Sequence, residues 1–314
     1  GEIRSLVATA EAYTKKGQAP QRILQRIDLA EAVVELVVYS PLIAKAARAG
    51  QFIRVLPWEK GELVPMTLAD WDVKNGTITL VVQGLGSSSM KINQMQVGDA
   101  FTGIAGPLGL PSKLHRYEND ETVVFTAGGV GLPPVYPIMR EHLRMGNHVT
   151  LIAGFRNRDM MFWDEEDKRI GSLQAEYPDL LDVIYTTNDG SFGIKDFVTG
   201  PLKEMLDSMQ DGSGLTVSEV VTIGPPMMMR AVSDLTKPYG VKTVASLNSI
   251  MVDATGMCGA CMVPVNIDGK MVRKHACIDG PELDSHIIDW DKFLPRFLQF
   301  REQEENNKIR HGFT

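Results

Sequence analysis

The sequence predicts an α/β protein with an additional all-β domain: an antiparallel β-barrel, then an open parallel α/β sheet, then a small C-terminal module. Three observations carry this prediction. Short apolar runs bounded by turn residues fill the first third of the chain, strand and helix patterns alternate from Glu121 onward, and all three cysteines lie between residues 258 and 277. The first pattern is typical of antiparallel barrels and the second of parallel sheets with crossover helices.

The barrel is predicted from strand-like runs between residue 21 and about residue 113. Each run is short and rich in β-branched or aromatic residues, and each is bounded by Gly, Pro or an Asn-Gly turn, as expected for consecutive antiparallel strands. The runs cover residues 33–38, 51–55, 77–82 and 101–105.

The parallel sheet is predicted from the alternation that follows. Residues 122–126 are predicted to form a strand, residues 133–145 a helix and residues 148–155 a second strand. Further strands are predicted at residues 182–186 and 220–223, each followed by a helical stretch. Parallel neighbours need such crossover connections, so we expect an open sheet with helices on its faces.

A glycine-rich turn follows the first of these strands. Gly128, Gly129 and Gly131 lie between the strand and the predicted helix. Glycines at the carboxyl end of a strand let a pyrophosphate approach unpaired backbone N–H groups at a helix N-terminus. The spacing G-G-x-G-x-P differs from the dinucleotide fingerprint G-x-G-x-x-G, but a purely structural turn rarely needs three glycines. The turn therefore predicts a nucleotide site.

Two earlier segments are less specific indicators of nucleotide binding. Residues 84–89 carry two glycines and three serines after a predicted strand, which suits a phosphate and suits a polar hairpin turn equally well. Residues 64–68 contain a proline that by itself indicates only the edge of a sheet.

The cysteines have the spacing of an iron–sulfur site. Cys258 and Cys261 form a C-x2-C pair, Cys277 follows at a distance, and Asp253 precedes Cys258 by the x4 gap of a plant-type [2Fe–2S] loop. Asp253 thus stands where the first cysteine ligand is expected, and Gly256 and Gly259 would let the backbone wrap closely around an inorganic core.

Two alternatives remain open for this segment. A zinc site would combine the cysteines with His275 or an aspartate. Buried cysteines without any ligand role are the other, although they would not explain the clustering. A disulfide is disfavoured because the number of cysteines is odd. Cysteines that stay free of disulfides suit a protein of a reducing compartment.

The bulk composition excludes several classes of protein. The 314 residues are enough for two or three domains, and 32 basic against 39 acidic residues give a net charge of −7, which argues against a nucleic-acid partner. The longest uncharged stretch, ending at Met139, contains three glycines and three prolines, so we expect no membrane helix. We expect a soluble cytoplasmic protein.

These patterns divide the chain into five parts. Residues 290–306 have phenylalanines at helical spacing among charged residues, and this predicted tail helix either docks a partner or packs within the chain. The predicted parts are an N-terminal extension (1–20), the barrel (21–118), the sheet (119–238), the cysteine module (239–290) and the tail (291–314).

Taken in order, these segments resemble the ferredoxin-NADP reductase superfamily, and within it the iron–sulfur flavoprotein branch. That branch contains the electron-transfer subunit of dihydroorotate dehydrogenase and the small subunits of sulfide dehydrogenase and of NADH-dependent reduced ferredoxin:NADP oxidoreductase. The resemblance covers about residues 20–305. It rests on the motifs at residues 50–52, 65–68, 106–109, 127–131, 224–228, 253–261 and 277–281.

The resemblance implies FAD on the barrel, NAD(H) over the sheet and a [2Fe–2S] cluster in the cysteine module. The residues that would hold FAD are Pro65, Met66, Thr67 and Leu68 at the isoalloxazine ring and Gly84, Gly86, Ser87 and Ser88 at the pyrophosphate. Those that would hold NAD(H) are Gly128, Gly129, Val130, Gly131, Gly224, Pro225 and Met227, with Arg156, Asp189 and Gly190 on the adenosine side. The cluster ligands would be Asp253, Cys258, Cys261 and Cys277.

The sequence departs from the family pattern at three positions. Val64 stands where many relatives have an arginine that pairs with the flavin phosphates, so phosphate binding would rest on backbone N–H groups. Ile223 stands where relatives often have a cysteine beside the nicotinamide. Asp253 in place of cysteine is similar to the transhydrogenase small subunits rather than to the dihydroorotate subunit.

By this resemblance, the flavin would take hydride from the nicotinamide and pass single electrons to the cluster, so no side chain is required as acid or base. The chain would be one of two subunits. Its larger partner would carry FAD and [4Fe–4S] clusters, bind NADP(H) and ferredoxin, and couple the reactions by electron bifurcation. The charges leave the nucleotide open, because residues 156–158 could pair with a 2′-phosphate and acidic residues 164–166 could repel one. We expect NADH rather than NADPH, mainly from the resemblance.

Two other functions fit the same residues. The chain would have the same cofactors as the small subunit of a sulfide, polysulfide or dihydroorotate dehydrogenase. A zinc-stapled regulator that binds a nucleotide without redox chemistry is the alternative from a different class.

Overall fold

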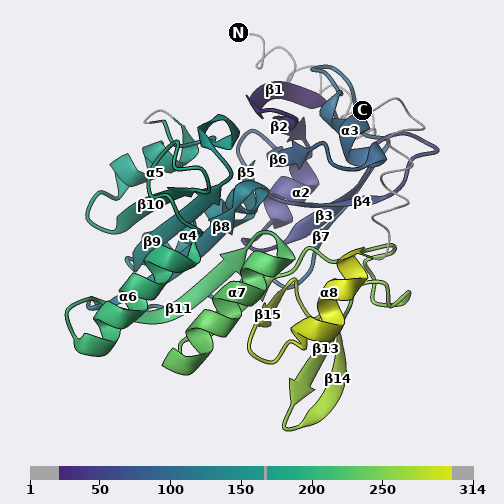
Figure 1. The fold of residues 1–314 in the computed structure, drawn as a ribbon. Coiled ribbons are helices and arrows are strands. Elements are labelled where there is room, and N and C mark those ends of the chain that lie inside the picture. Colours follow the sequence, from purple (N-terminus) through teal and green to yellow (C-terminus); the bar gives the residue numbers. More distant parts are fainter. Residues whose placement is uncertain (1–20, 166–167, 299–314) are drawn as a thin grey trace.

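The computed structural model describes residues 21–165 and 168–298, and it has two halves joined along one side (Figure 1). The first half is built from antiparallel strands in two sheets, ordered β1-β2-β6-β5 and β4-β3-β7. Its elements are β1 (Ile23–Ala30), β2 (Val33–Tyr39), α2 (Pro41–Ala46), β3 (Phe52–Leu56), β4 (Val64–Thr67), β5 (Asp70–Asp72), β6 (Thr77–Gln83), α3 (Ser87–Asn93) and β7 (Gly103–Leu108).

The four predicted strands of this half are confirmed, with their bounds moved by only a few residues. Alternate residues such as Leu36, Ile53, Val55 and Leu80 are fully buried and form one apolar core between the two sheets. Hydrogen-bonded pairing joins the strands within each sheet, so the antiparallel arrangement is confirmed, while closure into a barrel stays a prediction.

The second half contains the predicted open parallel sheet, which is confirmed. The strand order is β10-β9-β8-β11-β12-β15, and every neighbouring pair is parallel except β12 and β15. Its elements are β8 (Glu121–Gly128), η1 (Gly129–Gly131), α4 (Leu132–Arg144), β9 (His148–Phe155), η2 (Arg158–Met160), α5 (Arg169–Glu176), β10 (Leu181–Thr187), α6 (Thr199–Asp211), β11 (Thr216–Ile223), α7 (Pro226–Thr236), η3 (Lys237–Tyr239), β12 (Lys242–Ser246) and β15 (Glu282–Asp284).

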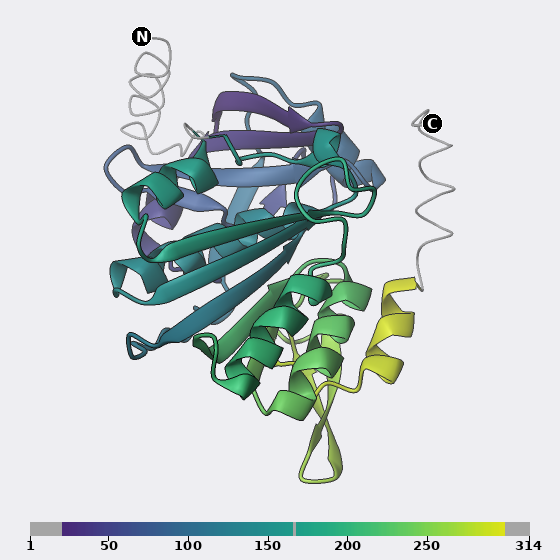
Figure 2. The same cartoon turned by 60° about the vertical axis from the view of Figure 1, so that its left-hand side comes forward.

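Both faces of this sheet are covered by helices, which is why its strands are almost continuously apolar. On β8, Val123 and Phe125 face the core shared with α4 and α5, while Val124 between them faces the core shared with α6 and α7. In Figure 2, α6 and α7 form one layer in front of the sheet and α8 (Trp290–Leu298) lies beside α7.

The cysteine segment extends this sheet and adds a hairpin. The strands β12 and β15, from either side of the segment, pair at the sheet edge, and β13 (Met262–Ile267) and β14 (Lys270–His275) project from it (Figure 1). Asp268 and Gly269 connect β13 to β14 with positive φ angles of 51° and 77°. This is the Asp-Gly hairpin turn whose twist suits two antiparallel strands.

The described part of the tail helix packs within the chain. Phe293 is 1% exposed and contacts Trp290 edge to face, with ring centroids 5.9 Å apart. Both belong to the core of the cysteine module. Residues 299–306 of the predicted helix, including Phe300, lie outside the described residues, as does the N-terminal extension 1–20. None of the helices within the described ranges has the length and apolar character to cross a bilayer.

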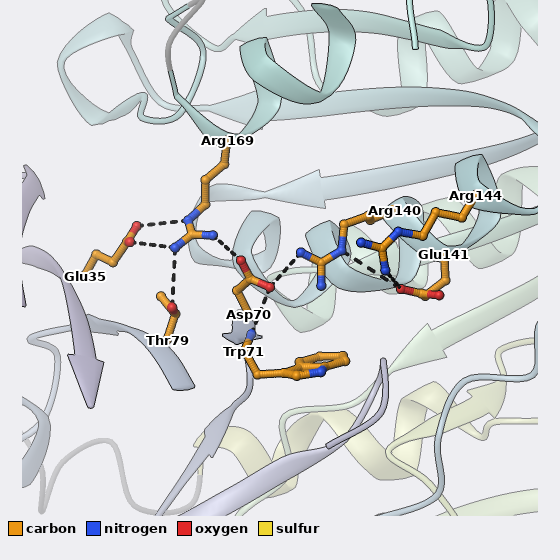
Figure 3. Close-up of polar contacts among 8 residues, drawn as sticks. All are labelled: Glu35, Asp70, Trp71, Thr79, Arg140, Glu141, Arg144 and Arg169. Atoms are coloured by element: carbon orange, nitrogen blue, oxygen red, sulfur yellow. Dashed lines mark hydrogen bonds and ion pairs between the residues drawn. The ribbon is translucent and has the colours of Figure 1, made fainter. Parts of the chain in front are cut away.

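The two halves are joined by apolar contacts and by an ionic network. Asp70, at the start of β5, accepts from Arg169 at 2.5 Å and from Arg140 at 2.7 Å (Figure 3). Arg169 also pairs with Glu35 of β2 at 2.8 Å. Because these cations come from α4 and α5 and the carboxylates from the β half, the network spans the two halves.

Candidate functional site

The carboxyl edge of the parallel sheet brings two predicted segments together. A methyl group on Gly131 would lie 2.1 Å from the carbonyl oxygen of Ile223, and one on Gly224 would lie 3.0 Å from the nitrogen of Gly128. Glycine is therefore required for the turns after β8 and β11 to touch. This point lies where the strand order changes direction, which is where open α/β sheets bind ligands.

The turn after β8 is shaped to expose backbone. Gly129 has a φ angle of 53° and has no atom within 4 Å of the position that a Cβ would occupy. Val130 is half-buried, and η1 lies next to β6 of the β half. The predicted residues Pro225 and Met227 are exposed at the start of α7. The two turns therefore form an accessible edge, and the first of them lies beside β6 of the β half.

The predicted adenosine side lies at the ends of β9 and β10. Arg156 is exposed, and its carbonyl accepts from the backbone N–H of Asp189 at 3.3 Å. Asp189 and Gly190 are exposed as well, and the Asp189 side chain accepts from Ser191. The structure thus brings these three predicted residues together.

An ion pair in the same place was not anticipated from the sequence. Arg158 Nη1 lies 2.6 Å from Asp164 Oδ2, and the guanidinium of Arg158 stacks 4.8 Å from the ring centre of Phe192. Arg158, which could attract a 2′-phosphate, is therefore paired with Asp164, one of the acidic residues that could repel one. The two residues are six positions apart. At that spacing, neither the periodicity of a helix nor that of a strand brings two side chains into contact, so it did not predict the ion pair.

The predicted flavin strand β4 alternates between two faces. Met66 and Leu68 are 9% and 1% exposed and belong to the core of the β half. Pro65 and Thr67 are half-buried and face the other way. Side chains of Pro65 and Thr67, together with the backbone of this segment, are therefore what the strand presents to a ligand.

The predicted pyrophosphate segment begins α3. The Ser89 hydroxyl accepts from the N–H groups of Leu85 and Gly86 at 3.0 and 2.9 Å, and Ser88 donates to Glu62 at 3.1 Å. Gly84, Gly86, Ser87 and Ser88 are all half-buried. The serine side chains thus stabilise the turn. These contacts are consistent with a purely structural turn and with a phosphate-binding segment.

The hairpin brings two of the predicted cluster ligands together. Cys261 precedes β13 and Cys277 follows β14, and the pairing of Met262 with His275 places the two cysteines side by side. Their sulfur atoms are 3.1 Å apart and both residues are 2% exposed. Burial and the hydrogen bond with Cys261 raise the pKa of the Cys277 thiol to about 12.

The other two predicted ligands lie on the adjoining loop. The carboxylate of Asp253 accepts from the N–H groups of Thr255 and Cys258, both at 2.9 Å, and Cys258 is exposed. These hydrogen bonds lower the pKa of Asp253, the Thr255 contact having the largest effect. Within residues 21–165 and 168–298, no three His, Cys, Asp or Glu side chains are arranged to hold a metal ion.

The donor set nevertheless suits an iron–sulfur cluster. Ala254, Gly256 and Gly259 have positive φ angles of 57°, 85° and 67°, so the loop curls around its own N–H groups. Cysteines bind metals as thiolates, and two adjacent buried thiolates would both be negatively charged. A bound metal would supply the positive charge that balances them. Arg54 of β3 was not predicted from the sequence; its guanidinium donates to the carbonyls of Val252 and Asp253.

Comparisons with known proteins agree with this geometry. Residues 125–234 match the oxidoreductase NAD-binding domain family, and residues 248–289 match the iron–sulfur cluster binding domain of dihydroorotate dehydrogenase B. The second match sets the zinc alternative aside. The electron transfer subunit homolog of dihydroorotate dehydrogenase B (NAD(+)) from Thermotoga maritima is 36% identical over 289 residues, covering 92% of this chain and 94% of the homolog.

Solved structures extend the likeness to the whole fold. A chain described under "Insights into flavin-based electron bifurcation via the NADH-dependent reduced ferredoxin-NADP oxidoreductase structure" superposes with a TM-score of 0.79 at 34% identity, covering 94% of this chain and 99% of that one. Ferredoxin-NADP+ reductase from Plasmodium falciparum superposes with a TM-score of 0.52 at 14% identity, covering 70% of this chain and 90% of its own, which shows a shared fold alone.

The fold and the two sites define an NAD-linked iron–sulfur oxidoreductase with the fold of ferredoxin-NADP reductases. Among such proteins, the chain belongs to the family of dihydroorotate dehydrogenase B electron-transfer subunits and their homologues. This confirms the resemblance inferred from the motifs.

Proposed function

We propose that this chain is the NADH-oxidising subunit of a flavin-based electron-bifurcating transhydrogenase. The observation that carries the proposal is the superposition along almost the full length of both chains on the structure described as an NADH-dependent reduced ferredoxin-NADP oxidoreductase. The partner would be a larger subunit with FAD and [4Fe–4S] clusters that binds NADP(H) and ferredoxin. We propose that this complex lies in the cytoplasm; the three free cysteines, which suit a reducing compartment, support this location.

The proposed parts follow the predicted boundaries. Residues 21–118 would close into a barrel and bind FAD against Pro65 and Thr67, residues 119–238 would bind NADH, and residues 239–290 would bind the [2Fe–2S] cluster. A bound flavin would supply the conversion between two-electron and one-electron transfer.

The residues of this chain would bind and orient the reactants. The turns at Gly128 and Gly224, held in contact, would position the nicotinamide end at the edge of the sheet. The ionic network around Asp70 and Arg169 would keep that edge against the β half. No side chain in this arrangement is needed to move a proton.

Three measurements test the proposal. The purified chain should contain FAD and about two iron atoms per chain, and NADH should bleach its visible flavin absorption under anaerobic conditions. Native mass spectrometry of complexes isolated from the source cells should then identify a larger flavoprotein bound to it. A colourless protein that NADH does not change would contradict the proposal.

The dihydroorotate dehydrogenase complex is the second candidate, favoured by the names of several relatives. In that case the partner isolated with the chain would be a dihydroorotate-oxidising flavoprotein. Reduction of NAD+ by dihydroorotate in the isolated complex, without ferredoxin, would decide for it.

A further inference from the structure

The central strand of the three-stranded sheet is buried on both faces. On β3, Ile53 and Val55 are fully buried in the core of the β half. The residues between and before them face the opposite way, because side chains alternate along a strand. Of these, Phe52 belongs to the core of the cysteine module, and Arg54 is 9% exposed. The outer face of β3 is therefore the surface on which the cysteine module rests.

Arg54 makes a specific contact across that surface. Its Nη1 donates to the carbonyl of Asp253 and its Nη2 to the carbonyl of Val252. These two residues begin the loop that carries the predicted ligands Asp253 and Cys258. Arg54 is also the direct strand partner of Pro65, the predicted flavin contact on β4. The strand that pairs with the predicted flavin strand thus also holds the start of the cluster loop, through the side chain of Arg54.

The acceptors around Arg54 are neutral. Its two Nη atoms donate to backbone carbonyls, and among the described residues its Nε is buried without a hydrogen-bond partner. The carboxylate of Asp253 points instead to the N–H groups of Thr255 and Cys258. A buried cation held only by neutral carbonyls is costly unless an anion lies nearby.

We infer that Arg54 is a positioning residue that fastens the cluster loop to the flavin-side sheet and supplies positive charge that raises the reduction potential of the cluster. The inference rests on the proposed function in requiring a bound cluster. Four anionic ligands make such a site negative, and one-electron reduction adds one further negative charge without making or breaking a bond. A buried cation beside the loop favours the reduced form, since net charge and hydrogen bonding set these potentials.

The test compares charge with hydrogen bonding at one position in the full chain. Arg54→Gln removes the charge and keeps an N–H donor, whereas Arg54→Lys keeps the charge but cannot reach two carbonyls with a rigid fork. Arg26→Gln is the matched control, because Arg26 also donates from a strand of the β half to two carbonyls, those of Asn93 and Met95. In both views β1, which carries Arg26, lies far from the β13–β14 hairpin (Figures 1 and 2).

Three properties are measured for each variant: iron content, the midpoint potential by EPR-monitored redox titration, and amide hydrogen exchange in residues 250–258. Arg54→Gln should lower the potential and speed exchange. Arg54→Lys should speed exchange while its potential stays close to the wild-type value, and Arg26→Gln should change neither.

Each remaining outcome is decisive. An unchanged potential in Arg54→Gln at full iron content, or an equal fall in both Arg54 variants, would overturn the role of charge. If Arg54→Gln binds no iron, faster exchange in residues 250–258 supports the fastening role and unchanged exchange overturns it. A wild-type chain that itself lacks the EPR signal would instead count against the proposed function.

Discussion

Glu35 and Arg169 form an ion pair across the two halves of the molecule, with 2.8 Å between Glu35 Oε1 and Arg169 Nη2 (Figure 3). The Glu35 side chain is only 6% exposed, and its other oxygen accepts from Trp163 Nε1 at 2.9 Å. Burial by itself lowers the pKa of Arg169, but Glu35 and Asp70 outweigh it and raise the pKa overall. The guanidinium of Arg169 therefore stays charged wherever the protein is folded.

Replacing Arg169 by methionine should destabilise the protein by about 3 kcal/mol, because it leaves the buried carboxylate of Glu35 without its cation. Urea unfolding at pH 7 measures this. Arg144→Met is the control, since Arg144 pairs with Glu141 at the surface, where such pairs contribute about 0–1 kcal/mol. Equal and small losses in both variants would show that the network does not hold the halves together.

Glu282 should make stability depend on pH. Its Oε1 lies 2.5 Å from Ser112 Oγ where β15 meets the β half, and burial raises the pKa of its carboxyl to about 7. Between the ordinary pKa and 7 the folded protein binds more protons than the unfolded chain, so stability falls as pH rises through this range and is level above it.

Glu282→Gln should remove that loss. The variant keeps a partner for Ser112 and should gain stability over the wild type at pH 8 but not at pH 4.5. Urea unfolding at both values checks the difference, with Asp284→Asn, an exposed carboxylate on the same strand, as the control. A gain of the same size at both pH values would contradict the assignment.

The local elements were predictable from the sequence and several long-range pairings were not. The strand at 148–155 and the helix after Gly131 follow from periodicity and from glycine and proline signals within the segment itself. Glu35 and Arg169 are 134 residues apart, and nothing in either segment selects the other as a partner. Ion pairs of this kind are set by how the halves pack, which the pattern of one strand does not contain.

In the candidate site, too, local features were predictable from the sequence and long-range contacts were not. The spacing of Cys258 and Cys261 indicated the cluster loop, and the Asp268-Gly269 turn was the unused signal that brings Cys277 back to Cys261. The only feature of the sequence that singled out Arg54 was its charge within an otherwise apolar strand. Its role depends on both faces of β3 being buried, which only the packing of the cysteine module decides.

The Arg158–Asp164 pair leads to a prediction about the nucleotide. Paired with Asp164, Arg158 is a weak partner for a 2′-phosphate, so Asp164→Asn should free it and raise kcat/KM for NADPH about tenfold or more, because a hydrogen bond to a charged group contributes about 1.5–3 kcal/mol. Flavin reduction kinetics with NADPH and NADH measure the ratio. Asp159→Asn, an exposed carboxylate in the same loop, is the control. An unchanged ratio would mean that Arg158 does not face the 2′ position.

Asp253 offers the sharpest test of the cluster site, because its carboxylate caps the loop in this structure and is also the predicted ligand. Asp253→Cys should still assemble a [2Fe–2S] centre, with an altered potential and a weaker pH dependence, since a thiolate takes up a proton less readily on reduction. Asp253→Asn keeps an oxygen that can accept from Thr255 but provides only a neutral donor.

A ligand and a cap therefore respond differently to the same change. If Asp253 binds iron, Asp253→Asn should lose iron or shift the g-values and potential, and Asp253→Ala should do so more strongly or recruit another donor such as His275. If Asp253 only caps the loop, Asp253→Asn should resemble the wild type and Asp253→Ala should loosen the loop. Iron analysis and EPR decide between them, and full occupancy with unchanged g-values and potential in Asp253→Ala would exclude the carboxylate as a ligand.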